Sequence, residues 1–397
     1  MSETYPTIRL MPKAEARAIR HGFPWVYANE LVLDRRTKNL APGTFAVLED
    51  AERRPMALVT VNPASRIAAR VMDMDPAAVV DGAWVRVRLA AALAHRERLY
   101  SAPYYRLVHA EADRLPGLVV DRFGDTAVMQ PNAAWAEAMA GEIAAALVEV
   151  AGVAHVVKNG TSRGRGLEGL PEEMAVLEGA APEGPVPVPM NGATYLADLM
   201  EGQKTGLFFD QRENHAFAAR LATGGRVLDV FAHVGGFSLA ALAGGAAEAL
   251  AVDSSAPALA LAGQGAAAGG MEARFATRQG DAFDTMAALA AEGESFDLVI
   301  CDPPAFAPNK AALDKGLRAY ERVARLAAPL VREGGYLGLC SCSHAADLAN
   351  FRAASARGIG KAGRRGMLIH TGFAGPDHPQ LPQLAESGYL KSVFFRL

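Results

Sequence analysis

From about Ala193 onward, apolar segments of strand length alternate with helical segments, and this alternation constrains the fold most strongly. The segments at 226–232, 248–255 and 296–304 are rich in Val, Leu, Ile and Ala, and the last two end in polar residues or prolines. Strands that alternate with helices at this spacing form a parallel sheet with helices on both faces. Residues 186–397 are therefore predicted to be a Rossmann-like, doubly wound α/β domain.

Two smaller domains are predicted before it. In residues 1–75, short apolar runs alternate with turn signals such as Pro42–Gly43, which is typical of a small β-rich barrel. Residues 76–185 contain strand patterns around a helix from Ala133 to Val150 and are predicted to be a small α+β domain. The Pro/Gly-rich segment 179–192 is interpreted as a connector.

Charge and cysteine content limit the class of protein. The net charge is −3, yet residues 1–70 hold 11 Lys or Arg against 7 Asp or Glu, an excess that could attract an anionic polymer as readily as it could be an ordinary surface. No apolar run is long enough to span a bilayer, so no membrane partner is expected. Three cysteines, an odd number, favour a reducing compartment, and we expect a cytoplasmic protein.

Four acids come at the ends of successive predicted strands: Asp229, Asp253, Asp281 and Asp302. Ligands of doubly wound sheets bind where the strands end. Asp253 is placed to bind both ribose hydroxyls of an adenosine, and Asp281 is placed to reach the adenine edge. Each acid alone could equally be a helix cap or a surface turn. Four in succession favour a binding site.

The first turn of this domain favours a particular cofactor. Gly235 and Gly236 open a helix, where glycine lets the backbone approach a ligand closely. The G-x-G-x-x-G pattern that a dinucleotide pyrophosphate requires is absent. Acids also repel phosphates but attract the sulfonium of S-adenosylmethionine, which is therefore the predicted cofactor.

The segment DPPAF is the most specific indication of a nucleobase-binding site. Two prolines after Asp302 predict a rigid, extended turn that presents this carboxylate and the ring of Phe306. A carboxylate can pair with a nucleobase and an aromatic ring can stack on it. The alternative is a rigid loop that only closes the sheet.

A thiol is predicted beside this loop. Cys342, in SCS after the next strand, is expected level with Asp302 and is the candidate nucleophile, although a strand cysteine is more often inert packing. Cys340 is the less favoured thiol, and Cys301 should point into the core. The spacing of these cysteines does not fit zinc, so no metal site is predicted.

The segment 202–215, GQKTGLFFDQRENH, mixes charges with two phenylalanines. Asp210 and Glu213 predict a capping box for the helix that follows. Gln203, Lys204 and Phe208 have no such structural reason, and they are interpreted as wrapping over the cofactor.

Together these segments resemble the bacterial large-subunit ribosomal RNA cytosine-5 methyltransferases that carry an N-terminal PUA domain. The likeness covers almost the whole chain. It rests on motifs in the same order: HGFPWVYANEL, YYRLVHAEADRLPGLVVDRFGD, GQKTGLFFDQREN, VLDVFAHVGGFSLAAL, DPPAFAPNK, SCS, DHPQL and YLK. The resemblance implies a PUA domain, a central strand–strand–helix–strand–strand domain and a class I methyltransferase domain, often paired as a homodimer. RNA would be the partner.

The resemblance also implies roles for individual residues. The nucleophile would be Cys342, and Asp302 would lie by the target base and the cofactor. The remaining cofactor-binding residues would be Lys204, Thr205, Phe208, Asp210, Arg212, Phe231, Gly235, Asp253 and Asp281. This sequence departs from the family pattern at two places. His233–Val234 stands where relatives usually have Tyr-Thr, and Ala305 stands where they often have Lys.

The implied reaction is methylation of carbon 5 of cytosine through a covalent cysteine adduct. Asp-Pro-Pro-x-Phe also occurs in enzymes that methylate a guanine ring nitrogen, which need no cysteine, so this chemistry is one alternative. A non-catalytic RNA-binding scaffold is the other, and the altered His233–Val234 loop is its only support. The thiol of Cys342 and the binding of cofactor discriminate among the three.

Overall fold

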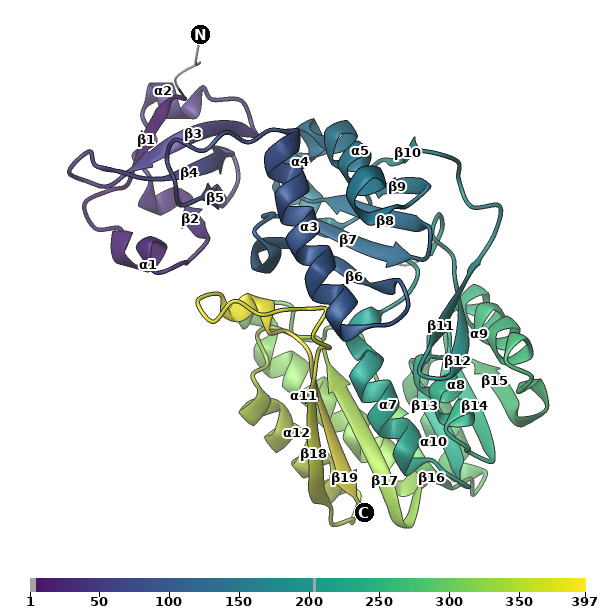
Figure 1. Cartoon of the computed structure of the whole chain (residues 1–397). Coiled ribbons are helices and arrows are strands. Elements are labelled where there is room, and N and C mark those ends of the chain that lie inside the picture. Colours follow the sequence, from purple (N-terminus) through teal and green to yellow (C-terminus); the bar gives the residue numbers. More distant parts are fainter. Residues whose placement is uncertain (1–4, 203–204) are drawn as a thin grey trace. The chain divides into compact units, whose positions relative to one another are not determined.

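The computed structural model describes residues 5–202 and 205–397 (Figure 1). The chain divides into two compact units. The first consists of Met1–Glu183, Leu199–Gly206 and Pro376–Ser387, and the second of Gly184–Asp198, Leu207–Gly375 and Gly388–Leu397. Within the described ranges, no helix has the length and apolar character needed to cross a bilayer.

The first unit begins with a five-stranded sheet in the order β1-β3-β4-β5-β2. Its strands are β1 Thr7–Arg9, β2 Trp25–Tyr27, β3 Thr44–Glu49, β4 Pro55–Val61 and β5 Ile67–Asp73. Short helices connect them: α1 Ala16–Arg20, η1 Ala28–Glu30 and α2 Arg35–Lys38. Only β1 and β3 pair in parallel. Apolar side chains such as Val26, Leu48 and Val59 face inward and form this sheet's own core, as the β-rich pattern predicted.

A second five-stranded sheet follows in the order β10-β9-β8-β7-β6. Its strands are β6 Tyr104–His109, β7 Leu118–Phe123, β8 Thr126–Pro131, β9 His155–Asn159 and β10 Met174–Glu178. Its helices are α3 Gly82–Leu99, η2 Ala110–Asp113, α4 Ala134–Ala138, α5 Ala140–Ala151 and α6 Arg163–Leu167. The single helix predicted from Ala133 to Val150 is therefore two helices, which meet at Met139.

Buried ion pairs connect the two sheets of the first unit. Arg70 of β5 donates to Glu111 and Glu168, each at 2.9 Å. Asn62 also donates to the Glu168 carboxylate at 3.0 Å. These bonds are shielded from water, so they contribute more than exposed pairs would.

The second unit opens with a hairpin where the sequence predicted a connector. β11 Val186–Met190 pairs antiparallel with β12 Ala193–Ala197, so the interpretation of 179–192 as a connector was wrong for its second half. Pro187 and Pro189 are exposed, while Val188 and Met190, which alternate with them, are buried. Proline is tolerated in such an edge strand because its missing N–H faces away from the ladder.

The remainder of the second unit is built on a seven-stranded sheet in the order β15-β14-β13-β16-β17-β19-β18. Its strands are β13 Arg226–Val230, β14 Glu248–Asp253, β15 Phe275–Gln279, β16 Phe296–Cys301, β17 Val331–Ser341, β18 Met367–Phe373 and β19 Lys391–Arg396. The helices are η3 Phe209–Gln211, α7 Arg212–Leu221, α8 Gly236–Ala243, α9 Ala256–Ala268, η4 Glu272–Arg274, α10 Ala282–Ala291, η5 Lys310–Ala312, α11 Leu313–Ala327, η6 Ala328–Leu330 and α12 Leu348–Lys361. A further short helix, η7 Ala385–Ser387, belongs to the first unit.

The central strands of this sheet are parallel and buried on both faces, which confirms the doubly wound α/β prediction. Leu298, Val299 and Ile300 of β16 are fully buried in succession, as expected for a strand covered by helices on both sides. The helices form two groups, α7–α9 and α10–α12, on the two faces of the sheet (Figure 1). β19 is the exception: it runs antiparallel between β17 and β18.

The three larger sheets lie at 7–73, 104–178 and 226–396. The domain boundaries predicted after residues 75 and 185 fall between elements, and they remain predictions.

Candidate active site

The strand order of the large sheet reverses between β13 and β16. The chain leaves β13 for β14 and β15, then returns to pair β16 with the other side of β13. In open α/β sheets a crevice for ligands forms at such a switch point, beyond the carboxyl ends of the strands. The predicted acids follow this rule: Asp229 lies in β13, Asp253 ends β14, and Asp302 follows β16.

The loop after β13 has an unusual backbone. Phe231, His233 and Gly235 have φ values of 64°, 50° and 79°, in the left-handed region that only glycine adopts at low cost. A Cβ on Gly236 would lie 2.7 Å from Nε2 of His215, so this position has no room for a side chain. Strain of this kind concentrates at ligand-binding loops, which supports the role predicted for Phe231 and Gly235.

Asp229 is a buried carboxylate with one unused oxygen. Oδ2 accepts hydrogen bonds of 2.9 Å from the backbone N–H and the hydroxyl of Ser238. Oδ1 is buried and has no hydrogen-bond partner among the described residues. Burial raises the pKa of this carboxyl to about 6. A ligand cation at Oδ1 would remove this cost, and S-adenosylmethionine carries both an ammonium and a sulfonium.

Asp253 and Asp281 differ in what their carboxylates already do. Asp253 accepts from the backbone N–H groups of His233 and Ser255, both at 2.9 Å, and so ties the strained loop to the end of β14. A carboxylate has about four acceptor positions, so hydroxyls can still bind it. Asp281 caps α10, accepting from Phe283 at 2.9 Å and from Asp284 at 3.1 Å. The helix-cap alternative therefore holds for Asp281, and contact with adenine would be an additional role.

Asp302 is held by an amide. Nε2 of Gln211 donates to its Oδ2 at 2.9 Å, and Asn214 donates to Oε1 of Gln211 at 2.7 Å. The β16–β17 register pairs Cys301 with Leu339, so the residue level with Asp302 is Cys340. The expectation that Cys342 lies level with Asp302 was therefore wrong by two residues, because the register depends on long-range pairing.

The three thiols differ in accessibility. Cys301 and Cys340 are buried, and desolvation together with the charge of Asp302 raises the pKa of both. Ser392 also donates to Sγ of Cys340 at 3.1 Å. Cys342 is only partly buried, directly after the end of β17. It is thus the least buried of the three cysteines.

The serines on either side of Cys342 are fully buried and explain the SCS motif. The Tyr320 hydroxyl of α11 is 2.7 Å from Oγ of Ser343 and 2.9 Å from Oγ of Ser341. Ser343 also accepts from the backbone N–H of Ala307, at 2.9 Å. Ala307 closes the DPPAFA loop, so this network fixes the thiol loop to the loop that carries Asp302. The ring of Phe306 lies 5.0 Å from that of Tyr320.

The predicted cofactor-covering segment is divided between the two units. Thr205 belongs to the first unit, where its hydroxyl donates to Asp121 at 2.6 Å. Lys204, like Gln203, lies outside the described residues. Phe208 belongs to the second unit, and its ring lies 5.0 Å from that of His233, against the loop after β13.

The end of this segment corrects one prediction. Helix α7 begins at Arg212 after Gln211, without a side-chain cap, so the capping box of Asp210 and Glu213 was wrong. Asp210 instead accepts from the Tyr389 hydroxyl at 2.6 Å. The long-range partner outcompetes the local one. Arg212 is buried, with its guanidinium 5.5 Å from the centre of the Phe209 ring.

Several residues of this site were missed by sequence reasoning. They are Gln211, Asn214, His215, Tyr320, Tyr389 and Lys391. Tyr389 and Lys391 stand in the YLK motif, which was quoted only for its likeness to relatives. His215 had no signal: it is a buried imidazole between the rings of Tyr195 and Phe237, and burial lowers its pKa to about 3.

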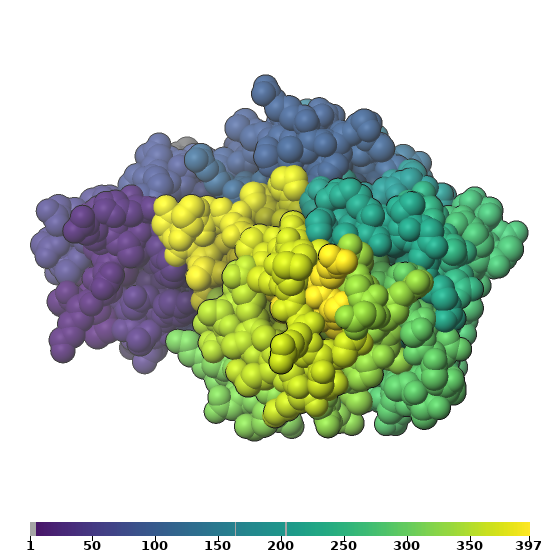
Figure 2. All heavy atoms as spheres, turned by 90° about the horizontal axis from the view of Figure 1, so that it is seen from below, coloured from purple at the N-terminus to yellow at the C-terminus, as the bar shows by residue number. Residues whose placement is uncertain are grey.

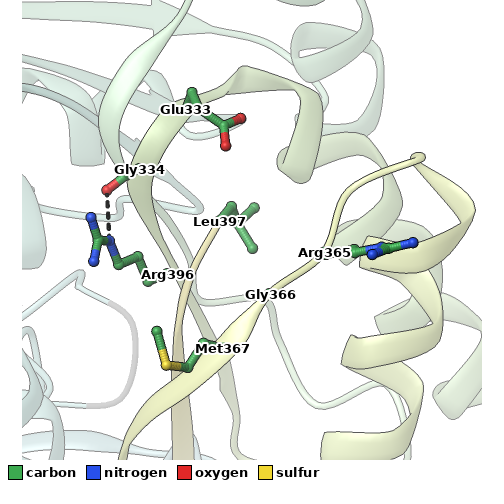
Figure 3. A pocket seen from close by; sticks show the side chains of 7 residues that line it. All are labelled: Glu333, Gly334, Arg365, Gly366, Met367, Arg396 and Leu397. Carbon is green, nitrogen blue, oxygen red and sulfur yellow. Dashed lines mark hydrogen bonds between the residues drawn. The ribbon is translucent and has the colours of Figure 1, made fainter.

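Two other observations concern metal binding and a second pocket. Among the described residues, no group of His, Cys, Asp or Glu could hold a metal ion. An open pocket lies between the first residues of β17, the start of β18 and the end of β19 (Figure 3). Its lining residues are Glu333, Gly334, Arg365, Gly366, Met367, Arg396 and Leu397. It is at the amino end of β17, whereas Cys342 follows the carboxyl end, so it is separate from the candidate site.

Comparison with known proteins agrees with this geometry. Residues 176–396 match the family model of S-adenosylmethionine-dependent methyltransferases, and residues 8–74 match that of PUA-like domains. The first match covers more than half of the chain. The chain therefore belongs to the S-adenosylmethionine-dependent methyltransferases, and S-adenosylmethionine is its cofactor.

Full-length relatives define the family more narrowly. The chain is 35% identical over 405 residues to the ribosomal RNA large subunit methyltransferase of Deinococcus radiodurans, covering 99% of this chain and 98% of that protein. It is 33% identical over 399 residues to ribosomal RNA large subunit methyltransferase I of Erwinia tasmaniensis, covering 98% of this chain and 100% of that protein. The chain belongs to this family of large-subunit ribosomal RNA methyltransferases with an N-terminal PUA-like domain.

Solved structures show the same fold over the whole length. A structure described as an S-adenosylmethionine-dependent methyltransferase from Streptococcus mutans has a TM-score of 0.82 at 19% identity and covers 99% of this chain and 100% of its own. A methyltransferase complexed with S-adenosylhomocysteine has a TM-score of 0.83 at 20% identity, with the same coverage. At this identity the likeness concerns the fold.

Proposed function

We propose that this protein methylates carbon 5 of a cytosine in large-subunit ribosomal RNA through a covalent adduct with Cys342. The observation that carries the proposal is the accessible thiol of Cys342, held between two buried serines at the end of the strand next to Asp302. The names of the full-length relatives support large-subunit ribosomal RNA as the substrate.

Carbon 5 of cytosine is a poor nucleophile, and the thiol supplies the activation. The Cys342 thiolate adds to carbon 6, which pushes electron density onto carbon 5. S-adenosylmethionine supplies the methyl group that carbon 5 takes up, and S-adenosylhomocysteine leaves. A base then removes the proton from carbon 5, the ring double bond re-forms, and the thiolate is expelled from carbon 6.

Asp302 is proposed to bind the ring nitrogen and amine of the cytosine. Gln211 orients this carboxylate by its hydrogen bond of 2.9 Å to Oδ2. In its protonated form Asp302 can donate to the ring nitrogen and stabilise the charge that builds up there after addition at carbon 6. The target base must first be unstacked, which costs a few kcal/mol in a duplex and less in a loop.

The cofactor site is proposed to lie at the switch point of the sheet. Asp229 Oδ1 would hold a cationic group of the cofactor, and Asp253 would bind the ribose hydroxyls. The remaining proposed cofactor residues are Lys204, Thr205, Phe208, Asp210, Arg212, Phe231, Gly235, Asp281 and Asp302. Of these, Phe231 is part of the strained loop after β13, and the ring of Phe208 packs against His233 of that loop. Both positions are consistent with a cofactor pocket at this loop.

The decisive experiment compares wild type with Cys342→Ala on ribosomal RNA from cells lacking the gene, with methylated nucleosides identified by mass spectrometry. We expect 5-methylcytosine with wild type and none with Cys342→Ala, which should still bind S-adenosylmethionine in a calorimetric titration. Cys340→Ala is the matched control and should keep turnover within about threefold, because its thiol is buried.

The same experiment separates the alternatives. Normal turnover by Cys342→Ala, or a methyl group on a guanine nitrogen, would overturn the covalent mechanism. A wild-type protein that binds no S-adenosylmethionine would instead be a scaffold. As a direct test of the adduct, RNA with 5-fluorocytosine at the target should form a stable complex with wild type, because fluorine blocks the proton removal that releases Cys342.

Two further features are proposed. The three cysteines are thiols rather than disulfides, which suits the reducing cytoplasm. A homodimer is also proposed, because the edge strand β18 has four exposed apolar side chains: Met367, Leu368, Ile369 and Phe373. The yellow-green part of the second unit is exposed on the face seen in Figure 2. Sedimentation equilibrium of wild type and Met367→Lys would test the dimer.

A further inference from the structure

Lys391 is a buried cation beside the strand that carries the nucleophile. It begins β19 and pairs with Ser341, the last residue of β17. Its side chain is buried, and Nζ donates to the carbonyl oxygens of Ser343 and Ala346, both at 2.7 Å. Both acceptors are neutral. Among the described residues, no carboxylate forms an ion pair with Lys391.

A buried ammonium that forms no ion pair is unfavourable. It loses its hydration, and hydrogen bonds to two carbonyls only partly offset this loss. Burial accordingly lowers the pKa of Lys391. A neutral side chain could donate hydrogen bonds to the same turn with a smaller loss of hydration free energy. The positive charge of Lys391 therefore needs a further reason. An anion formed during the reaction would supply one.

Cys342 is the group that can become this anion. It directly precedes Ser343, whose carbonyl the ammonium binds, so Nζ lies against the turn that presents the thiol. The charge of a Cys342 thiolate and the charge of the Asp347 carboxylate, at the start of α12, both oppose the lowering of the Lys391 pKa. The interaction is reciprocal: the cation must favour the thiolate to the same extent.

The other titratable groups near the thiol are two acids, a phenol, a second thiol and His344, whose side chain is exposed rather than buried against the turn. Asp302 follows β16, Asp347 caps α12, and both are acids that oppose a thiolate. Tyr320 on α11 is a neutral phenol whose pKa burial raises, and the charge of Cys342 raises it further. Cys340 is buried with its own pKa raised. Lys391 is the cation of this set.

We propose that Lys391 is a positioning residue that stabilises the thiolate of Cys342 and holds the turn from Ser343 to Ala346 behind it. This inference rests on the proposed covalent role of Cys342. The thiolate is the nucleophile, and an ordinary cysteine, with a pKa of about 8.5, is only a few per cent ionised near neutrality. A lysine near the sulfur raises that fraction.

The test measures the thiol itself. The rate of alkylation by iodoacetamide is followed from pH 5.5 to 9.5 in wild type, Lys391→Gln and Lys391→Arg, with Cys342→Ala as the blank. We expect the wild-type midpoint to lie below about 8.5. In Lys391→Gln, which keeps a donor but loses the charge, the midpoint should rise by about one pH unit and alkylation at pH 7 should slow by about tenfold. Lys391→Arg should stay near wild type.

A matched control separates charge from folding. Lys361→Gln removes an exposed lysine of α12 that pairs with Glu321, and it should leave the alkylation profile unchanged. Thermal unfolding and calorimetric titration with S-adenosylmethionine confirm that each variant is folded. A wild-type midpoint at or above 8.5, or a folded Lys391→Gln protein with the wild-type midpoint, would overturn the inference.

Failure of the proposed function gives a different result. If Lys391→Gln shifts the alkylation midpoint while Cys342→Ala still methylates RNA, the lysine does stabilise the thiolate but the reaction does not use it. If the inference is right and the covalent mechanism holds, the pH profile of kcat for Lys391→Gln should shift upward with the alkylation midpoint, and part of the lost rate should return at high pH.

Discussion

The Tyr320 hydroxyl lies 2.7 Å from Oγ of Ser343, and both groups are buried. Through Ser343 this one phenol connects helix α11 to two loops, since Ser343 also accepts from the backbone N–H of Ala307. Cys342 and Asp302 stand on these two loops. The Tyr320 hydroxyl therefore helps to set the distance between Cys342 and Asp302 through Ser343.

Removal of that hydroxyl in Tyr320→Phe should loosen the thiol loop. Two buried serines lose a partner, which costs about 1–3 kcal/mol of unfolding free energy for each group left unsatisfied. We expect a lower melting temperature and a kcat reduced about tenfold or more, with an unchanged dissociation constant for S-adenosylmethionine. Tyr336→Phe, in the middle of β17, is the control. A Tyr320→Phe protein with wild-type kcat would show that the network does not position Cys342.

The substitution Asp229→Asn tests whether Oδ1 of Asp229 binds a cationic group of the cofactor. The pKa of Asp229 is raised to about 6, so the carboxylate is charged above that pH and largely neutral below it. A cationic cofactor should therefore bind more tightly as the pH rises from 5 to 7, by up to about tenfold per unit below the pKa. In Asp229→Asn the affinity should fall about tenfold to a hundredfold and lose this pH dependence, as calorimetric titration would show.

The exposed acid Asp314 at the start of α11 provides the control for charge. Asp314→Asn should bind S-adenosylmethionine with wild-type affinity at each pH. Equal pH dependence in wild type and Asp229→Asn would mean that another group contacts the cation.

The parts of the fold that could be predicted are those that local sequence determines. A buried parallel strand requires a continuous apolar run such as Leu298–Cys301, and it can be recognised without knowing its neighbours. Because the carboxyl ends of such strands share one edge, the acids that follow them could be assigned to one site. The family's motifs then pointed to Cys342 and to cytosine methylation, which stay proposals.

The parts that could not be predicted depend on partners far along the chain. Strand β19 lies antiparallel between β17 and β18, which brings Lys391 beside Ser341. No local sequence pattern indicates this pairing. Asp210 and Glu213 fit a capping box, yet Tyr389, 179 residues away, binds Asp210 instead. Alternating prolines made β11 resemble a connector, although they fit its exposed face.

His215 should make the stability of the protein depend on pH. Its pKa is lowered to about 3 by burial, whereas an unfolded histidine titrates near 6.5. Between these two pH values the unfolded chain binds more protons than the folded protein. The contribution of His215 to the free energy of unfolding is therefore complete above pH 6.5 and is lost as the pH falls toward 3. Asp229, whose pKa is raised, contributes in the opposite direction between pH 3.8 and about 6.

The two contributions are separated by comparing variants in urea unfolding at several pH values. From pH 6.5 to 4, the unfolding free energy of wild type should fall more steeply than that of His215→Phe, by up to about 1.4 kcal/mol per pH unit. His95→Phe, at an exposed position on α3, should show the wild-type slope. Parallel curves for wild type and His215→Phe would mean that the imidazole is protonated in the folded protein.

Two glycines offer opposite outcomes for the same substitution. Gly235 has a φ of 79°, and a Cβ there would lie 3.1 Å from Cβ of Ala262 and 3.2 Å from Cγ of Leu239. Gly263, in the middle of α9, has ordinary helical backbone, and a Cβ there would have no neighbouring atom within 4 Å. Gly235→Ala should therefore strain the cofactor loop, and Gly263→Ala should fit without any shift.

Gly235→Ala should reduce the unfolding free energy by more than about 1 kcal/mol, because alanine at a positive φ is strained and the neighbouring side chains must move. Its dissociation constant for S-adenosylmethionine should rise as the loop from Phe231 is displaced. Gly263→Ala should instead stabilise the protein by about 0.5–1 kcal/mol, since alanine is the better helix former, with no effect on cofactor binding. Equal effects of the two substitutions on cofactor affinity would show that the strained loop is not part of the cofactor site.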